Sequence, residues 1–299
     1  MFGWQKKNKK IDTSNEDFVS NSIRDNWYQA NSYYPLPFAL VTTVDEQGRP
    51  NIGPHSFTMP YGVITDYALV LITRHNSNTA LNLQRTKKCA LNFIEFDKEH
   101  LKTVVALGYP GQTTEEKMAH QNFTLIDSPT AGRGTGDGLH PPLIKEAIQV
   151  YECTLDESVD FHYNKHSTAR NFIIKLDSIL LKETWHKSIN SDNAHMPNLA
   201  ISYGFRDSKD FWFTEHGKPF SIPVPTDLGP KVHAVSYTAN RLDDEVKFTK
   251  EACEKLTGIP RVFLKTVLNA IIKRAKEEGV TLVDAPFVDK LNEERKNKS

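Results

Sequence analysis

One short segment, Arg74 to Asn82, carries the residue types that bind a phosphate group. Arg74 is a cation, Ser77 and Thr79 are hydroxyl donors, and Asn78 or Thr79 stands where a helix is predicted to begin. Phosphates are held by backbone N–H groups at a helix N-terminus together with cations and hydroxyls. The alternative interpretation is an ordinary helix start, in which Asn78 caps the helix and Arg74 is solvated.

A second polar segment, His55-Ser-Phe-Thr58, follows a predicted strand. In an extended chain Ser56 and Thr58 project to one face, and His55 and Phe57 project to the other. One pair is therefore able to border a flat ligand ring and its hydrogen-bonding edge, while the other packs into a core or a subunit contact. The alternative for each residue is a half-buried strand end whose polar groups are satisfied within the protein.

These two segments interrupt short β-rich runs where strands should end. Residues 38–44 are a β-branched run, and the turn that follows ends in Gly48, which readily takes positive φ. The apolar runs at 67–73 and 89–96 suit central strands of a closed sheet. Because small barrels hold ligands at their rims, the pattern predicts a barrel with a ligand site at one end.

The order of motifs from Asn31 to Pro225 resembles the flavin-reductase-like FMN-binding split barrel family. The matching motifs are PLPFALVTT with its D-x-x-G turn, N-x-x-x-x-S-F from Asn51 to Phe57, the basic residue and T-x-x-N at Arg74, Thr79 and Asn82, and the strand CALNFIEF. Further likenesses are EEKMAHQNFTLIDS, HPPLIKEAIQVYECTL and FIIKLDSILLKETW, although Gln121 and Asn122 stand where the family usually has glycine.

The resemblance implies FMN as the cofactor and NADH or NADPH as its electron donor. It assigns the phosphate to Arg74, Ser77, Asn78, Thr79 and Asn82, and the ring or ribityl chain to Asn51, His55, Ser56, Phe57 and Thr58. It also implies a homodimer, because split barrels of this kind usually build the flavin site at a subunit interface. No catalytic side chain is assigned, since the flavin supplies the reactive chemistry and the protein orients it.

From about Thr238 the apolar spacing becomes helical. Helices are predicted at 248–256, at 260–278 with Gly279 just past the end, and from Pro286 onward. The segment FTKEACEKLTGIPRVFLKTVLNAIIKRAKEEGVTLVDAPFVDKLNEE resembles the small C-terminal helical domain of a light-independent protochlorophyllide reductase subunit. It implies no pigment synthesis, because neither a nitrogenase-like domain nor cluster-binding cysteines accompany it. We interpret the region as a helical clip on the barrel or dimer, or as a surface for a protein partner.

Composition limits the remaining classes of function. The chain has 299 residues, of which 38% are hydrophobic and 25% charged, as in soluble globular proteins. Lys plus Arg equals Asp plus Glu at 37 each, so we expect no nucleic-acid partner and interpret the N-terminal lysines as a solvated tail. The longest apolar run falls short of the roughly 20 residues that span a bilayer. With no secretory signal and three scattered cysteines, we expect a cytoplasmic protein without a membrane partner.

Several remaining patterns favour structural interpretations. His162 and His166 have an H-x-x-x-H spacing without a third ligand, so we expect surface histidines and no metal site. Glycines at alternate positions from Gly132 to Gly138 do not fit a dinucleotide-binding motif and predict a mobile loop, or alternatively a lid over the flavin. The aromatic run Phe211-Trp-Phe213 favours a core or dimer contact, and Cys153 a buried apolar position.

The sequence therefore predicts a mainly β fold with helices: an N-terminal tail and short helix (1–30), an FMN-binding split β-barrel (31–235) and a small all-α domain (236–299). Within the first two regions, helices are predicted at 16–29, 79–86 and 142–150. The predicted function is a flavin-reductase-type oxidoreductase that passes hydride from NADH or NADPH to flavin and on to a small-molecule or flavin acceptor. One alternative is a non-catalytic FMN carrier or sensor whose helical domain docks on a partner. Another is an oxidoreductase reduced by a protein donor.

Overall fold

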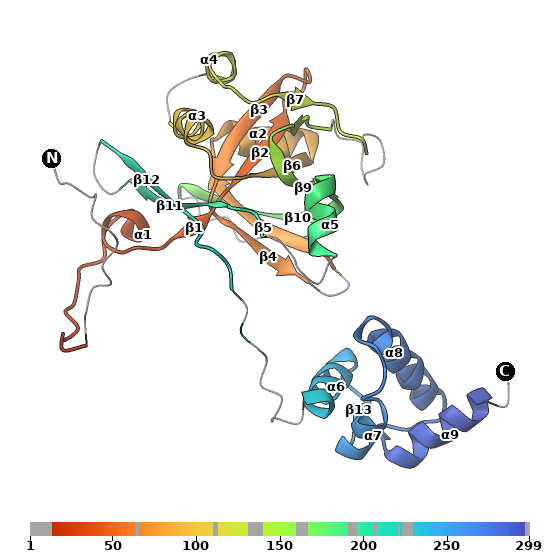
Figure 1. The fold of residues 1–299 in the computed structure, drawn as a ribbon. Coiled ribbons are helices and arrows are strands. Elements are labelled where there is room, and N and C mark those ends of the chain that lie inside the picture. Colours follow the sequence, from red (N-terminus) through yellow and green to blue (C-terminus); the bar gives the residue numbers. More distant parts are fainter. Residues whose placement is uncertain are drawn as a thin grey trace. The chain divides into compact units, whose positions relative to one another are not determined.

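The computed structural model describes residues 14–63, 66–109, 113–130, 140–159, 167–190, 196–205, 209–220, 222 and 230–296. The chain forms two compact units, Met1–Pro219 and Phe220–Ser299 (Figure 1). Each unit has its own hydrophobic core, so each is described by itself.

The first unit is built on a seven-stranded antiparallel sheet with the strand order β3-β2-β6-β9-β10-β5-β4. Its strands are β2 (Ala39–Val44), β3 (Pro50–His55), β4 (Thr58–Gly62), β5 (Ala68–Arg74), β6 (Lys88–Ile94), β9 (Ala147–Leu155) and β10 (Ala169–Leu181). The apolar runs predicted as central strands correspond to β2, β5 and β6. All six residues of β2 are buried, because this strand lies between β3 and β6 and is covered on both faces.

The sheet is curled. Helix α2 (Asn78–Thr86) contacts β2, β3 and β5, although β3 and β5 lie near opposite ends of the strand order. Ala80 and Leu83 of α2 are fully buried in the core that Val41, Leu71 and Leu91 form on this face. A single helix can reach both ends only if the sheet wraps around it, so the prediction of a mainly β split barrel with helices is confirmed.

A second core lies on the other face of the sheet. Leu40 and Ile52 pack there with Leu101, Val104 and Leu107 of helix α3. The remaining helices and small sheets of this unit surround the barrel, with α3 and α4 lying beside β3 in Figure 1. These elements are α1 (Trp27–Ala30), α3 (Lys98–Gly108), α4 (Thr114–Ala119), α5 (Glu183–Ile189), the sheet of β1 (Leu36–Pro37), β11 (Ala200–Phe205) and β12 (Phe211–Glu215), and the pair β7 (Leu125–Ile126) and β8 (Leu143–Ile144).

One predicted helix is shorter in the structure, and another is replaced by strands. The helix expected at 16–29 is confined to the single turn α1, and Phe18 and Ile23 are exposed. A short helix without a packing partner is marginal, and these apolar residues have no buried face to support one. The helix expected at 142–150 is replaced by β8 and β9, because β9 pairs with a strand on each side and this pairing overrides local propensity.

The second unit is helical around one core. Its elements are α6 (Pro230–Leu242), α7 (Lys250–Lys255), α8 (Arg261–Glu277), α9 (Ala285–Lys296) and the parallel pair β13 (Lys247–Phe248) and β14 (Leu282–Val283). The predicted α8 is confirmed: Pro260 is its N-cap residue, Gly279 follows its end with φ 70°, and Leu268 and Ala275 are fully buried. Helix α6 was not predicted.

The structure also bears on several smaller features of the sequence. Among the described residues, no helix is long and apolar enough to cross a membrane, and no three potential metal ligands gather together. Cys89, Cys153 and Cys253 are buried free thiols. Phe213 packs against Phe38 with a ring-centroid distance of 5.8 Å, in agreement with a core position. The histidine pair at 162 and 166 and the glycine run at 132–138 lie outside the described residues.

Candidate functional site

Helix α2 begins immediately after β5 ends. Ser77 N–H donates to the Arg74 carbonyl at 3.1 Å, which closes the turn between the two elements. Ser77 is the N-cap residue, and its Oγ accepts the Ala80 N–H at 3.2 Å. The alternative in which Asn78 caps the helix is therefore wrong. The amide of Asn78 instead donates to Thr114 Oγ1 at 2.7 Å and ties α2 to α4.

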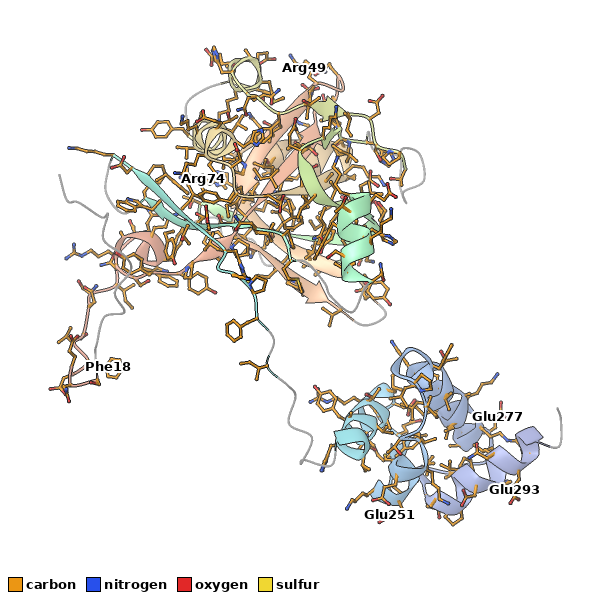
Figure 2. All side chains as sticks on the ribbon, viewed as in Figure 1. Phe18, Arg49, Arg74, Glu251, Glu277 and Glu293 are labelled. Carbon is orange, nitrogen blue, oxygen red and sulfur yellow. The ribbon has the colours of Figure 1, made fainter. Side chains whose placement is uncertain are left out.

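The N-terminus of α2 offers open donors. The N–H groups of Ala80 and Leu81 are taken by Ser77, whereas those of Asn78 and Thr79 have no partner among the described residues. Arg74, labelled in Figure 2, is exposed, and no carboxylate of the described chain lies within ion-pair distance of it. The Ser77 hydroxyl accepts one bond and keeps its proton for another. Two N–H groups, a cation and a hydroxyl at a positive helix end are the kinds of group that can hold an anion.

His55 and Thr79 form a partly buried polar contact beneath this end of the helix. His55 Nε2 lies 3.0 Å from Thr79 Oγ1, and the Thr79 side chain is almost fully buried. Gly53 makes the contact feasible, because a Cβ atom there would lie 2.4 Å from Thr79 Oγ1 and 2.9 Å from His55 Nε2. Burial lowers the pKa of His55 from 6.5 to about 4, so the imidazole is neutral at pH 7.

Asn51 and Asn82 are also buried and meet at a common acceptor. Their Nδ2 atoms donate to Thr43 Oγ1 at 3.4 and 3.2 Å respectively. This contact joins β2, β3 and α2 and fixes the depth of the helix in the barrel. Thr43 was not among the predicted site residues. The signal available in the sequence was a pair of threonines inside an otherwise apolar strand.

The segment from Ser56 to Thr58 connects β3 to β4 and lies beside β5. Ile72 N–H donates to the Phe57 carbonyl at 2.9 Å, and Thr58 is paired with Leu71. Ile72 and Arg74 are two residues apart in β5 and therefore project from the same face of that strand. The segment thus lies along the strand that ends in Arg74. Its role at a flavin ring stays a prediction.

A pocket of about 220 Å³ lies over this segment. Its aromatic walls are Trp27, Tyr28, Tyr34 and Phe57, and the remaining wall residues are Leu36, Ser56, Met59 and Ile72. The Tyr28 and Phe57 rings pack edge to face with their centroids 4.9 Å apart. Burial raises the pKa of Tyr28, an effect that the nearby Arg74 cation partly opposes. Sequence reasoning missed this pocket, because residues 27–36 were interpreted as a tail and the approach to a strand.

A curled antiparallel sheet wrapped around a helix is the architecture of a split β-barrel. Residues 31–183, just over half of the chain, match the family described as flavin reductase like domain, and the chain belongs to that family. The predicted family is thus confirmed for the first unit, whereas the resemblance of the C-terminal helices stays a prediction.

Solved structures with the same fold include a nitroreductase and a monooxygenase component. The Pseudomonas fluorescens 2-nitrobenzoate 2-nitroreductase superposes with a TM-score of 0.52 and 19% sequence identity, covering 67% of this chain and 90% of that one. Nitrilotriacetate monooxygenase component B from Bacillus cereus gives a TM-score of 0.51 and 14% identity, covering 69% of this chain and all of that one (100%). At these identities the likeness establishes the fold.

The buried His55 predicts a pH dependence of stability. Its pKa is about 4 in the folded protein and about 6.5 when unfolded, so the unfolded chain takes up the proton first as the pH falls. The part of the folding stability that depends on a neutral His55 ring is fully present above pH 6.5. It is lost as the pH falls from about 6.5 to 4. Between pH 7 and 4.5, wild type should lose about 2 kcal/mol more free energy of unfolding than His55→Gln. An NMR titration midpoint of the His55 ring near 6.5 would contradict the assignment.

Proposed function

We propose that the first unit binds FMN, with the phosphate at the N-terminus of α2 and the ring along Ser56 to Thr58. The observation that carries this proposal is the convergence of Arg74, Ser77 and the two open N–H groups at one helix end. A phosphate dianion needs this combination of charge and directed donors. The donor set fits FMN, and the adjoining strand β5 leads from it to the segment proposed for the ring.

Each residue then has a defined task. Arg74 and Ser77 hold the phosphate, while Thr79 and Asn82 lock the helix to His55 and Thr43 inside the barrel. Asn51 acts through the same Thr43 contact, so we assign it to positioning rather than to direct contact with the ribityl chain. Bound FMN supplies the electron-transfer chemistry, and the protein binds it, orients it and limits its access to water.

The activity that we propose is a flavin-reductase-type oxidation of NADH or NADPH with delivery of electrons to a small-molecule or flavin acceptor. Membership of the flavin reductase like family supports it. We also propose a cytoplasmic homodimer. Edge strand β4 and the residues between it and β5 expose the large side chains Tyr61, Val63 and Tyr67, which a second copy would cover.

A second candidate is a non-catalytic FMN carrier whose helical unit docks on a partner protein. The observation that favours it is the separate hydrophobic core of the second unit, which lets that unit act as a module of its own. A carrier would hold FMN tightly and oxidise nicotinamides negligibly.

An absorption spectrum of the purified protein tests these proposals. We expect oxidised-flavin bands that bleach on anaerobic addition of NADPH or NADH. Bands that persist with both nucleotides would favour the carrier, and bands that bleach only with a ferredoxin-like protein would identify a protein-reduced enzyme. A protein that is colourless and does not bind added FMN would refute the flavin site.

A further inference from the structure

We propose that the aromatic pocket over Ser56 and Phe57 binds an uncharged, single-ring aromatic compound, which is the small-molecule acceptor of the proposed reaction. The role of this compound as acceptor rests on the proposed function, whereas the binding site itself rests on the geometry of the pocket. Helix α1 and the residues that follow it supply one side, and the β3–β4 connection with Ile72 supplies the other.

The volume of the pocket decides the size of its ligand. An apolar cavity of about 150 Å³ holds benzene, whereas drug-sized ligands need roughly 300 to 1,000 Å³. At about 220 Å³ the pocket has room for one ring with a small substituent. That size matches a single ring better than the fused three-ring system of a flavin, so we place this ligand beside the proposed flavin position.

The residues that line the pocket indicate the chemical class of its ligand. Trp27 and Tyr28 both line the pocket, and their rings stand nearly perpendicular, at 80° with ring centroids 6.0 Å apart. A flat ring makes favourable offset or edge-to-face contacts with such walls, and a puckered ring does not. None of the described residues that line the pocket is charged, which favours an uncharged ligand. The hydroxyl of Ser56 is a polar group available to one substituent.

The position of the pocket connects it to the proposed flavin site. Ser56 and Phe57 line the pocket and also belong to the segment proposed to border the flavin ring. Ile72, another wall residue, shares a strand face with Arg74 at the phosphate end. A ring held in the pocket therefore lies next to the segment that would hold the flavin.

The redox step balances with the donor already proposed. For a nitroarene, one hydride from NADPH, passed through the flavin, and one proton from solvent convert the nitro group to a nitroso group and water. NADPH becomes NADP⁺, so two electrons leave the donor and two enter the acceptor.

The test uses nitrobenzene as the probe and the full chain loaded with FMN in the oxidised state. Binding is measured by calorimetry and by saturation-transfer NMR, which need no turnover. Nitrocyclohexane is the matched ligand, because it has the same substituent on a puckered ring. The variants are Trp27→Ala, whose side chain is 51% exposed and lines the pocket, and Trp212→Ala, which removes an equally large, 39% exposed side chain from β12 outside the pocket.

We expect nitrobenzene to bind about tenfold more weakly to Trp27→Ala than to wild type, with Trp212→Ala unchanged. FMN affinity should stay within about twofold in both variants. Equal effects of the two substitutions, or equal binding of nitrocyclohexane, would overturn the proposal. Competitive displacement of nitrobenzene by NAD⁺ would assign the pocket to the nicotinamide and overturn the acceptor. If wild type binds no FMN, the proposed function fails, and the same titrations without FMN still decide the pocket.

Discussion

Replacing Arg74 by alanine should raise the dissociation constant for FMN by roughly 10- to 100-fold, as measured by quenching of FMN fluorescence. Among the described residues, Arg74 supplies the only cation of the anion site that we propose at the start of α2. Loss of a hydrogen bond to a charged group costs about 1.5–3 kcal/mol, and each 1.4 kcal/mol is a factor of ten in affinity. Because Arg74 is exposed, its removal should leave the fold intact.

Arg85→Ala is the matched control for this experiment. Arg85 lies in the last turn of the same helix, is exposed and forms only an exposed ion pair with Glu46 at 3.7 Å. Its loss should change FMN affinity by less than about twofold, since such pairs contribute little. The double change of Arg74 and Thr79 to alanine is expected to weaken FMN further. It is less informative, because Thr79→Ala also removes the buried partner of His55. An unchanged FMN affinity in Arg74→Ala would refute the phosphate site.

Gly53→Ala should destabilise the barrel and weaken FMN binding together. The added Cβ atom would lie 2.4 Å from Thr79 Oγ1, and Thr79 is a β-branched residue buried at the first turn of α2. Rotation of its β-branched side chain is restricted, so we expect the helix end itself to shift. Overpacking of this kind costs about 1–3 kcal/mol, which corresponds to a fall of several degrees in the thermal midpoint of a unit of this size. Displacement of the donors at Asn78 and Thr79 then raises the dissociation constant for FMN.

Gly217→Ala separates this effect from the general cost of replacing a glycine. A Cβ atom at Gly217 meets nothing within 4 Å, so its thermal midpoint and FMN affinity should match those of wild type. Thermal unfolding followed by circular dichroism and an FMN titration provide the two readouts. A Gly53→Ala protein that unfolds and binds FMN like wild type would show that α2 is not held at this depth by Gly53.

Local chemistry was sufficient for much of the fold. The runs that became β2, β5 and β6 are mostly apolar, and they are bounded by turn residues. Both ends of α8 carry local signals, because Pro260 precedes its first turn and Gly279 takes the positive φ that other residues avoid. The start of α2 was predicted for the same reason. Signals of this kind lie within a few residues of the feature that they specify.

The remaining features depend on residues that are distant in the sequence. Strand β9 forms where a helix was predicted, because β6 and β10 offer it hydrogen-bond partners on both sides. Thr43 becomes a common acceptor only when β3 and α2 are folded against β2. The aromatic pocket exists only because residues 27–36 return to residues 56–59 and Ile72. The sequence by itself determined the family, the central strands and the residues of the proposed phosphate site. The tertiary structure alone decided which of these residues reach the surface and which hold the site from within, since contacts between distant segments leave no periodic or local signal in the chain.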